Sequence, residues 1–236
     1  MKEVGKSLRN GVVSGFPIIL GYFPVAMAFG MLSRNVGITL KESSFFSLFV
    51  FAGASQFMAL DLIKAGVAAG NIILATFLLN LRHMMMSASL SVRLKEVKKR
   101  WLPFIAFGVT DETFSVSSLK GSNINTPFLL SLHTSSYASW VLGTFTGYMV
   151  GSILPMAVQN SLGIGLYAMF AALLVPEVKK SRNVLFLSLI AAAIYALITY
   201  FELVPQSWSL VVTIITAAGL GLLLKDDTAD AGEVKA

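Results

Sequence analysis

The sequence predicts an all-α polytopic membrane protein, because apolar residues are abundant, run in long stretches and are separated by short basic loops. Hydrophobic residues make up 56% of the 236 residues, and the mean hydropathy is +0.76. Several apolar stretches approach the ~20 residues that a membrane-spanning helix needs. We expect one helical bundle over residues 11–224, a cytoplasmic N-terminal segment over 1–10 and a disordered cytoplasmic tail over 225–236.

Eight apolar segments follow one another along the chain. Their ranges are 11–32, 43–62, 67–91, 102–119, 126–152, 157–175, 183–203 and 208–224. The first contains the helix breakers Pro17 and Pro24 and continues past residue 31, which favours an uncleaved membrane segment over a signal peptide. Polar or small residues occur deep within the second, third, fourth and sixth segments. The fifth segment repeats small residues at Gly143, Gly147 and Gly151, a spacing typical of helix packing, and the last two segments are apolar.

The distribution of basic residues constrains how these segments cross the membrane. Lys and Arg gather at 2–9, 93–100 and 179–182, and the positive-inside rule places such clusters in the cytoplasm. Full crossing by every segment would put the 93–100 cluster outside. If segments 43–62 and 157–175 instead enter the membrane and return as broken helices, all three clusters lie inside. Lys98 and Lys179 are then inside, and Lys64 and Lys120 are outside.

This arrangement predicts inverted repeats, with units over about 11–91 and 126–203 in opposite orientations, as in many secondary transporters. The alternative is plain crossing by all segments, with one segment miscounted. The basic loops suit anionic lipid as a partner rather than nucleic acid. The chain contains no cysteine and two histidines, and it lacks nucleotide-binding motifs, so the sequence gives no indication of a cofactor, a metal site or direct coupling to ATP.

Small and polar residues interrupt the second segment at Gly53-Ala54-Ser55-Gln56. A helix broken at this point would expose backbone N–H groups that can bind a carboxylate. Ser55 and Gln56 are therefore candidate substrate-binding residues. The alternative is close helix packing, with Gln56 hydrogen-bonded to a neighbouring helix.

Ionisable residues interrupt the third segment at Asn80-Leu81-Arg82-His83. Arg82 could bind a substrate carboxylate with two hydrogen bonds, and Asn80 could contribute to the same site. His83 could carry a coupled proton, since histidine titrates near neutral pH. The alternative for Arg82 is that its long side chain reaches the membrane interface.

Two adjacent acids, Asp111 and Glu112, lie near the middle of the fourth segment. Short carboxylates at this depth cannot reach water easily, and ionisable groups inside a membrane usually serve a substrate or ion path. Asp111 and Glu112 are candidates for binding a substrate ammonium group and for proton coupling. A structural ion pair with Arg82 is the alternative.

The motifs Gly53-Ala54-Ser55-Gln56-Phe57, Asn80-Leu81-Arg82-His83 and Thr110-Asp111-Glu112-Thr113-Phe114, in this order, resemble the AzlC family of branched-chain amino acid exporters. The resemblance covers about residues 11–200. It implies an inner-membrane exporter, the large subunit of a pair with a small hydrophobic AzlD-like membrane protein. The sequence departs from the family pattern at 162–170, where members often carry an Asp and this chain has no acid.

We therefore expect a secondary transporter, not an enzyme, that exports branched-chain or other apolar amino acids with proton coupling and has its N-terminus in the cytoplasm. A passive channel and a non-transporting assembly subunit are alternatives. An intramembrane serine protease built on Ser55 and His83 is a third, although rhomboid proteases have Gly after the serine and this chain has Gln56.

Overall fold

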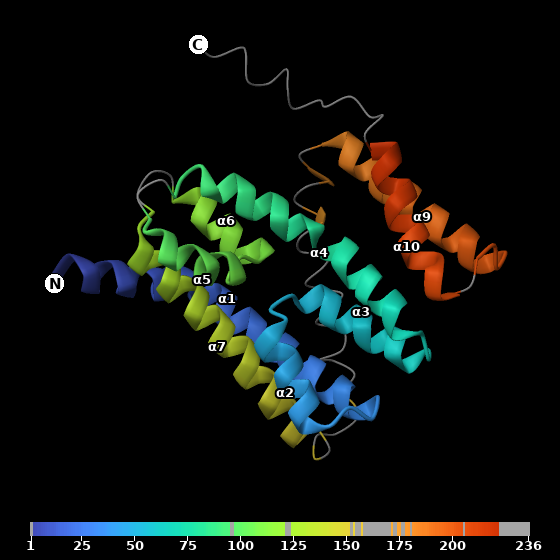
Figure 1. Ribbon diagram of the computed structural model, residues 1–236, viewed down its shortest axis with the longest axis horizontal. Helices are drawn as coiled ribbons and strands as arrows, with labels where there is room; N and C mark the ends of the chain where they lie inside the picture. Colours follow the sequence, from blue (N-terminus) through green and yellow to red (C-terminus); the bar gives the residue numbers. More distant parts are fainter. Residues whose placement is uncertain are drawn as a thin grey trace, which may run out of the picture. The chain divides into compact units, whose positions relative to one another are not determined.

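The computed structural model describes residues 2–94, 97–120, 124–151, 181–204 and 206–221, with isolated positions between 153 and 179. Every element in these ranges is helical, which confirms the predicted all-α class (Figure 1). Contacts divide the chain into two compact units, residues 1–61 with 80–166 and residues 62–79 with 167–236. The elements are α1 (Lys2–Asn35), α2 (Leu40–Phe49), α3 (Gly53–Lys64), α4 (Ala69–Ser91), the 3₁₀ helix η1 (Lys99–Trp101), α5 (Leu102–Phe107), α6 (Asp111–Leu119), α7 (Thr126–Val150), α9 (Arg182–Tyr200) and α10 (Gln206–Gly221).

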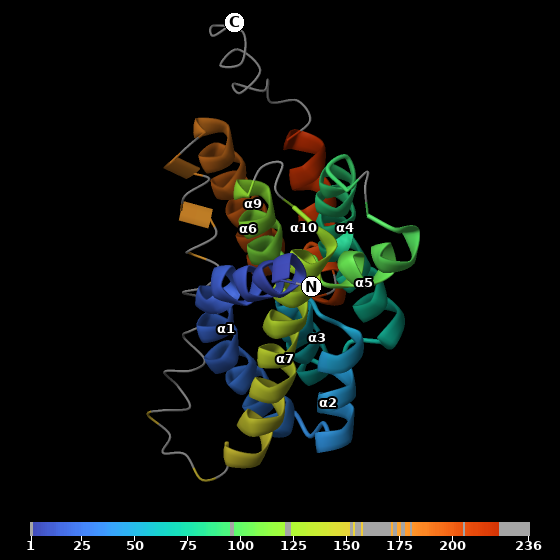
Figure 2. The ribbon, with the colours of Figure 1, turned by 90° about the vertical axis from the view of Figure 1, so that its left-hand side faces the viewer.

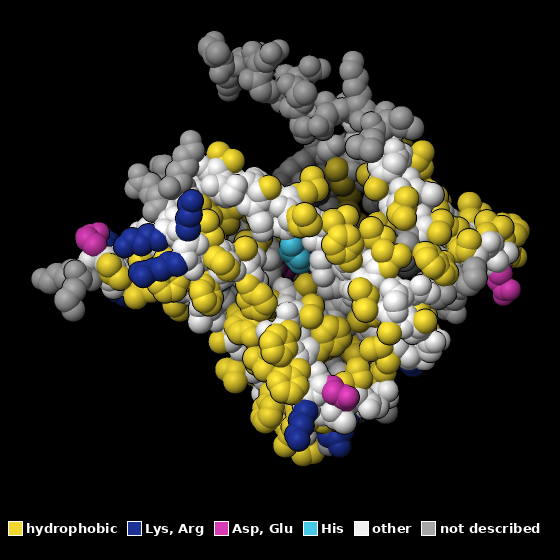
Figure 3. All heavy atoms as spheres, in the orientation of Figure 1, with side chains coloured by type: hydrophobic (Ala, Val, Ile, Leu, Met, Phe, Trp, Pro, Cys, Tyr) yellow, Lys and Arg dark blue, Asp and Glu magenta, His cyan; other side chains and the backbone are white. Residues whose placement is uncertain are grey.

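Three of the described helices are long and apolar enough to cross a membrane. They are Glu3–Asn35 of α1, α4 and α9. The face in Figure 3 is mostly hydrophobic over α2, α5 and α7, and Lys and Arg side chains gather near the N-terminus. Apolar side chains exposed over so large an area indicate a lipid environment.

The core of the first unit is a close pair of helices, α1 and α7, which lie side by side in both ribbon views (Figures 1 and 2). The two helices are parallel, since Gly11 lies against Phe128 and Ser131 whereas Gly151 lies against Met31. Glycine permits this approach: a Cβ atom on Gly147 would lie 2.1 Å from the Met27 carbonyl oxygen, and one on Gly30 would lie 2.1 Å from that of Thr144. The repeated glycines of the fifth segment, Gly143, Gly147 and Gly151, therefore form the surface of α7 that packs against α1.

The second apolar segment is a broken helix, as predicted. Helix α2 ends at Phe49, extended backbone follows at Val50, and α3 begins at Gly53. The chain then turns back, because the Phe29 ring contacts both Phe46 of α2 (5.7 Å between centroids) and Phe57 of α3 (5.6 Å). We call α2 and α3 the first hairpin.

The fourth apolar segment is also a broken helix, which the sequence analysis did not foresee. Helix α5 ends at Phe107, and α6 begins at Asp111 after the Thr110 N-cap. The Arg93 guanidinium, just beyond α4, donates a hydrogen bond of 2.9 Å to the Ser118 carbonyl at the end of α6. The chain therefore leaves the end of α4, enters with α5 and returns with α6, and we call this the second hairpin.

The two hairpins enter from opposite ends of the α1–α7 pair, and their breaks meet near its middle. Tyr22 of α1 packs edge-on against Phe51 in the first break (6.0 Å between ring centroids). Its hydroxyl oxygen lies 2.7 Å from the Thr110 hydroxyl oxygen in the second break. Phe51 also contacts Phe107 at 6.3 Å. Polar backbone at this depth is tolerated because it is enclosed by protein.

The second hairpin places Lys120 at a different end of the first unit from the one predicted. The Asn125 amide at the start of α7 donates a 2.9 Å hydrogen bond to Ser7 near the start of α1, and Lys6 and Lys120 line the same surface pocket. Lys120 therefore lies at the N-terminal end of α1, not at the opposite end. The prediction was wrong because residues 102–119 were treated as one crossing, whereas Gly108 and the Thr110 cap turn the chain back.

The directions of α1 and α7 also differ from those expected for inverted units over 11–91 and 126–203. Their first helices, α1 and α7, run in the same direction rather than in opposite directions. Most of segment 157–175, including the acid-free run at 162–170, lies outside the described residues, as does the tail over 225–236. The re-entry predicted for 157–175 therefore stays a prediction.

In the second unit, α9 packs against α10. A Cβ atom on Gly221 at the end of α10 would lie 3.1 Å from the Leu187 side chain in the first turns of α9. The turn between the two helices is short, so they form an antiparallel hairpin.

Candidate functional site

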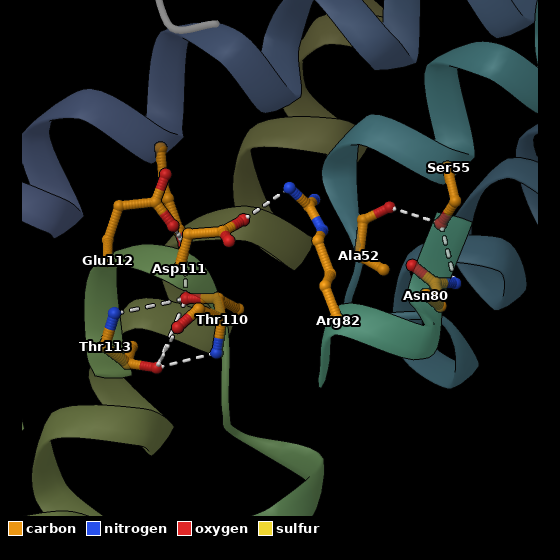
Figure 4. A network of polar contacts seen from close by, with 9 residues as sticks. Ala52, Ser55, Asn80, Arg82, Thr110, Asp111, Glu112 and Thr113 are labelled. Carbon is orange, nitrogen blue, oxygen red and sulfur yellow. Dashed lines mark hydrogen bonds and ion pairs between the residues drawn. The ribbon is translucent and has the colours of Figure 1, made fainter. Parts of the chain in front are cut away.

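The cationic and anionic motifs meet inside the first unit. Arg82 of α4 points towards Asp111 of α6 (Figure 4), and its Nη1 atom lies 2.9 Å from Asp111 Oδ2. The two side chains are 34% and 26% exposed, so the pair is only partly buried. The structure thus contains the predicted Arg82–Asp111 pair without burying it completely.

Glu112 lies one residue further along α6 and has a different partner. The Tyr22 hydroxyl of α1 donates a hydrogen bond to Glu112 Oε2, and it also lies within hydrogen-bond distance of the Thr110 hydroxyl. Tyr22 itself is only 6% exposed. The two adjacent acids therefore face different neighbours, Asp111 a guanidinium and Glu112 a phenol.

The start of α6 explains how two carboxylates are accommodated at this depth. Thr110 is the N-cap, and its hydroxyl accepts a hydrogen bond from the Thr113 N–H while the Thr113 hydroxyl accepts one from the Thr110 N–H. This reciprocal capping fixes the first turn of the helix. Asp111 and Glu112 stand in that turn, where the positive end of the helix dipole stabilises negative charge. The break therefore places and stabilises both acids.

Two polar atoms beside this cluster lack hydrogen-bond partners among the described residues. They are Oδ1 of Asn80 and Nε of Arg82, both on α4 and both buried. The Asn80 amide nitrogen is occupied, since it donates to Ser55 Oγ at 3.0 Å, and Ser55 in turn donates to the Ala52 carbonyl (Figure 4). An unpaired acceptor and an unpaired donor suit an ammonium group and a carboxylate, respectively.

Gln56, the other residue predicted in the first break, is fully buried. Its Oε1 atom accepts a hydrogen bond of 2.8 Å from the Trp140 indole, and its Nε2 atom donates one of 3.1 Å to Ser47. One end of the amide therefore holds the first hairpin against α7, and the other end ties α3 to α2 within the hairpin. Gly53 packs on the same Trp140 ring. The predicted direct role of Gln56 in substrate binding is untested.

The two histidines occupy different surroundings. His83 is half-buried next to Arg82 and close to Asp111. His133 of α7 is 3% exposed and lies against the Gly108 backbone, outside this cluster. Within the described ranges, no group of three or more His, Asp or Glu side chains could hold a metal ion.

Sequence reasoning missed two residues that organise the site. Tyr22 joins α1 to Thr110 and Glu112, and Phe51 fills the first break between Tyr22 and Phe107. The available signal for Tyr22 was a polar aromatic residue between the breakers Gly21 and Pro24. Nothing in the sequence distinguished Phe51 from the other phenylalanines of its segment.

Comparison with known proteins gives a consistent family assignment. The model of the AzlC protein family matches residues 17–154, which contain all the site residues described above. An uncharacterized membrane protein of Archaeoglobus fulgidus is 40% identical over 183 residues, covering 76% of this chain and 80% of the relative. No solved structure matches the chain.

Two further relatives have informative names. The inner membrane protein YgaZ of Escherichia coli is 32% identical over 185 residues, covering 75% of this chain and 76% of the relative. The branched-chain amino acid transport protein AzlC of Bacillus subtilis is 21% identical over 184 residues, covering 77% and 72%.

Proposed function

The chain belongs to the AzlC family, and from this premise we propose that it is a secondary transporter that exports branched-chain or other apolar amino acids. In this proposal it acts in the inner membrane with its N-terminus in the cytoplasm, is coupled to protons, and forms the large subunit of an exporter with a small AzlD-like partner. The name of the Bacillus subtilis relative supports amino acids as the substrate class. The basic residues at the N-terminal end of α1 support the orientation.

The observation that carries the proposal is the polar cluster where the two broken helices meet. A free amino acid has a carboxylate and an ammonium group about two bonds apart, and the cluster presents opposite charges at similar spacing through Arg82 and Asp111, 2.9 Å apart. The substrate can replace this ion pair by binding Arg82 through its carboxylate and Asp111 through its ammonium group. Asn80 Oδ1, unpaired within the described structure, is a further acceptor for the ammonium group.

Glu112 is the proposed proton carrier. It is held by Tyr22 rather than by a permanent cation, so protonation does not leave a buried positive charge without a partner. His83, beside Arg82 and near Asp111, is a second proposed proton carrier. Proton binding at Glu112 and substrate binding at Asp111, on adjacent residues of one helix turn, would couple the two events electrostatically.

The substrate assignment is tested by loading cells with isoleucine from a dipeptide that contains it. Cells that lack this gene and its small neighbour should accumulate more isoleucine than wild-type cells, because the export route is missing. Equal accumulation in both strains would refute the assignment. Efflux that does not respond to the pH gradient would instead support a passive channel.

Neutral substitutions test the two acids. Asp111→Asn and Glu112→Gln should insert at near-normal levels, because both side chains are only partly buried. At least one should abolish export, because an amide neither titrates nor carries charge. Asp61→Asn, an exposed acid on α3, is the matched control and should export normally. Normal efflux in both test variants would remove these acids from the mechanism, and loss of the protein in both would favour a structural ion pair.

A further inference from the structure

An apolar groove runs along the first unit, away from the polar cluster. Its volume is about 690 Å³, and it is lined by residues of α2, η1, α5 and α7, among them Leu48, Phe49, Trp101, Phe104, Phe107 and Tyr137. Volumes of this order accommodate ligands far larger than an amino acid side chain. The buried Phe51 ring separates the groove from Tyr22, since it contacts Phe107 and Tyr137 on one side and Tyr22 on the other.

The groove faces outward and extends from one end of α7 to its middle. Phe104 and Phe49 are 63% and 74% exposed, so the surroundings of the protein reach the groove directly. The lining residues of α7, at positions 130, 133, 134 and 137, form one helical face. Position 137 lies about 16 Å along α7 from its first residue, or roughly half the thickness of a bilayer core. The groove therefore has the length and direction to hold a chain-like apolar ligand that lies parallel to α7.

The end of the groove next to η1 is basic. Lys98, Lys99 and Arg100 are consecutive and exposed, directly before the lining residue Trp101. The Arg100 guanidinium lies 5.4 Å from the centre of the Trp101 ring, in a cation–π contact that holds it at the rim. Basic residues and a tryptophan at a membrane interface are the usual partners of lipid headgroups. The charge thus matches a ligand with an apolar chain and an anionic head.

Two polar side chains stand in the wall of the groove and fix its shape. His133 is only 3% exposed and packs between the Gly108 backbone and the Ile105 backbone. Tyr137 donates its hydroxyl to the Leu48 carbonyl of α2. The groove is therefore bounded by packed protein on the side of α7 and presents a mainly apolar surface to a ligand.

We propose that this groove is a binding site for an anionic phospholipid. One acyl chain lies along α7 between α5 and the tip of the first hairpin, and the phosphate binds Lys98, Lys99 and Arg100. Because the lipid touches both hairpins, through Leu48 and Phe107, it stabilises the arrangement in which the two breaks meet.

Native mass spectrometry of the full chain purified in detergent tests the site, with phosphatidylglycerol and phosphatidylcholine of identical acyl chains as probes. The wild-type protein should retain one phosphatidylglycerol in preference to phosphatidylcholine. The double variant K99Q/R100Q should bind phosphatidylglycerol about tenfold or more weakly, since two headgroup contacts are lost. The control K6Q/K120Q removes the same charge at the same end of the molecule, from another pocket, and should change binding less than about twofold.

A second pair of variants tests the groove itself and remains informative if the charge variants fold poorly. Thr134→Phe fills the groove and should abolish phosphatidylglycerol retention, whereas Leu142→Phe, at an exposed position of α7 outside the groove, should not. Equal losses in K99Q/R100Q and K6Q/K120Q would overturn the proposal in favour of diffuse electrostatic attraction. Unchanged retention in Thr134→Phe, or a bound polypeptide mass in place of the lipid, would also overturn it. None of these readouts depends on transport.

Discussion

Tyr22 shows how one side chain can connect the parts of a site that lie far apart in the sequence. Its hydroxyl contacts Thr110 and Glu112, 88 and 90 residues away, and its ring contacts Phe51 and Trp140. The hydroxyl and the ring therefore have separable roles, one towards the second hairpin and one towards the first.

We predict that Tyr22→Phe keeps the fold and impairs transport. The ring contacts remain, and the loss of one hydrogen bond should lower the free energy of unfolding by about 1 kcal/mol, while Glu112 loses its only described donor. Efflux assays and thermal melting in detergent measure the two effects. Tyr148→Phe is the control, because the Tyr148 hydroxyl donates a hydrogen bond of 3.0 Å to the Ile38 carbonyl, away from the site. Equal efflux in the two variants would contradict a role for the Tyr22 hydroxyl.

At the scale of helices, the breaks in α2–α3 and α5–α6 arise from local sequence and from contacts with α7. The Gly108 backbone fits against His133, where a Cβ atom would lie 2.4 Å from the imidazole, and the Thr110–Thr113 capping box starts α6. The first break is held by contacts with another helix, because Trp140 of α7 packs on Gly53 and donates a hydrogen bond to Gln56. Each hairpin is therefore fixed by the α1–α7 pair on which it rests.

The packing of that pair gives a second prediction. Gly147→Ala should destabilise the protein by about 1–3 kcal/mol, because the added methyl group would lie 2.1 Å from the Met27 carbonyl and must push the helices apart. Gly219→Ala has nothing within 4 Å of the added methyl and should leave the melting temperature unchanged or slightly raised, as alanine favours helix. A melting temperature of Gly147→Ala equal to that of the wild type would show that the helices do not pack this closely.

At the scale of the whole molecule, the two hairpins change the expected orientation of the loops. Residues near Ser7, Arg93 and Lys120 share one end of the first unit, and the α1 C-terminus near Arg34 lies at the other. The positive-inside rule predicts that the first end is cytoplasmic. This arrangement keeps basic residues of 2–9 and 93–100, together with Lys120, at one end of the first unit while leaving α1 and α7 parallel.

Single cysteines introduced into this cysteine-free chain test that arrangement in intact cells. Lys6→Cys, Lys98→Cys and Lys120→Cys should be protected from an impermeant thiol reagent, and Lys41→Cys, near the other end of α1, should react. Permeabilised cells provide the control for accessibility. Reaction of Lys120→Cys from outside would restore the original orientation and disprove the second hairpin.

The membrane class, the family and the motifs that build the site are all readable from the amino-acid sequence. Composition and apolar stretches define the class because the bilayer imposes a hydrophobic length on each crossing. Arg82, Asp111 and Glu112 stood out because charge is costly at membrane depth. The break near Gly53 followed from counting basic loops. All of these signals are local, or are set by the membrane, so they can be read without knowing which helices touch.

Which residues meet, and in which direction the helices run, became apparent only from the folded protein. Residues 102–119 have the length of a crossing, and contacts such as that of Arg93 with Ser118 show that they return. Tyr22, Phe51 and Trp140 acquire their roles from partners 29 to 118 residues away, and Gln56 proved to be enclosed by such partners. The physical reason is that a membrane specifies how deep a residue lies but not its neighbours, which depend on the close packing of α1 against α7.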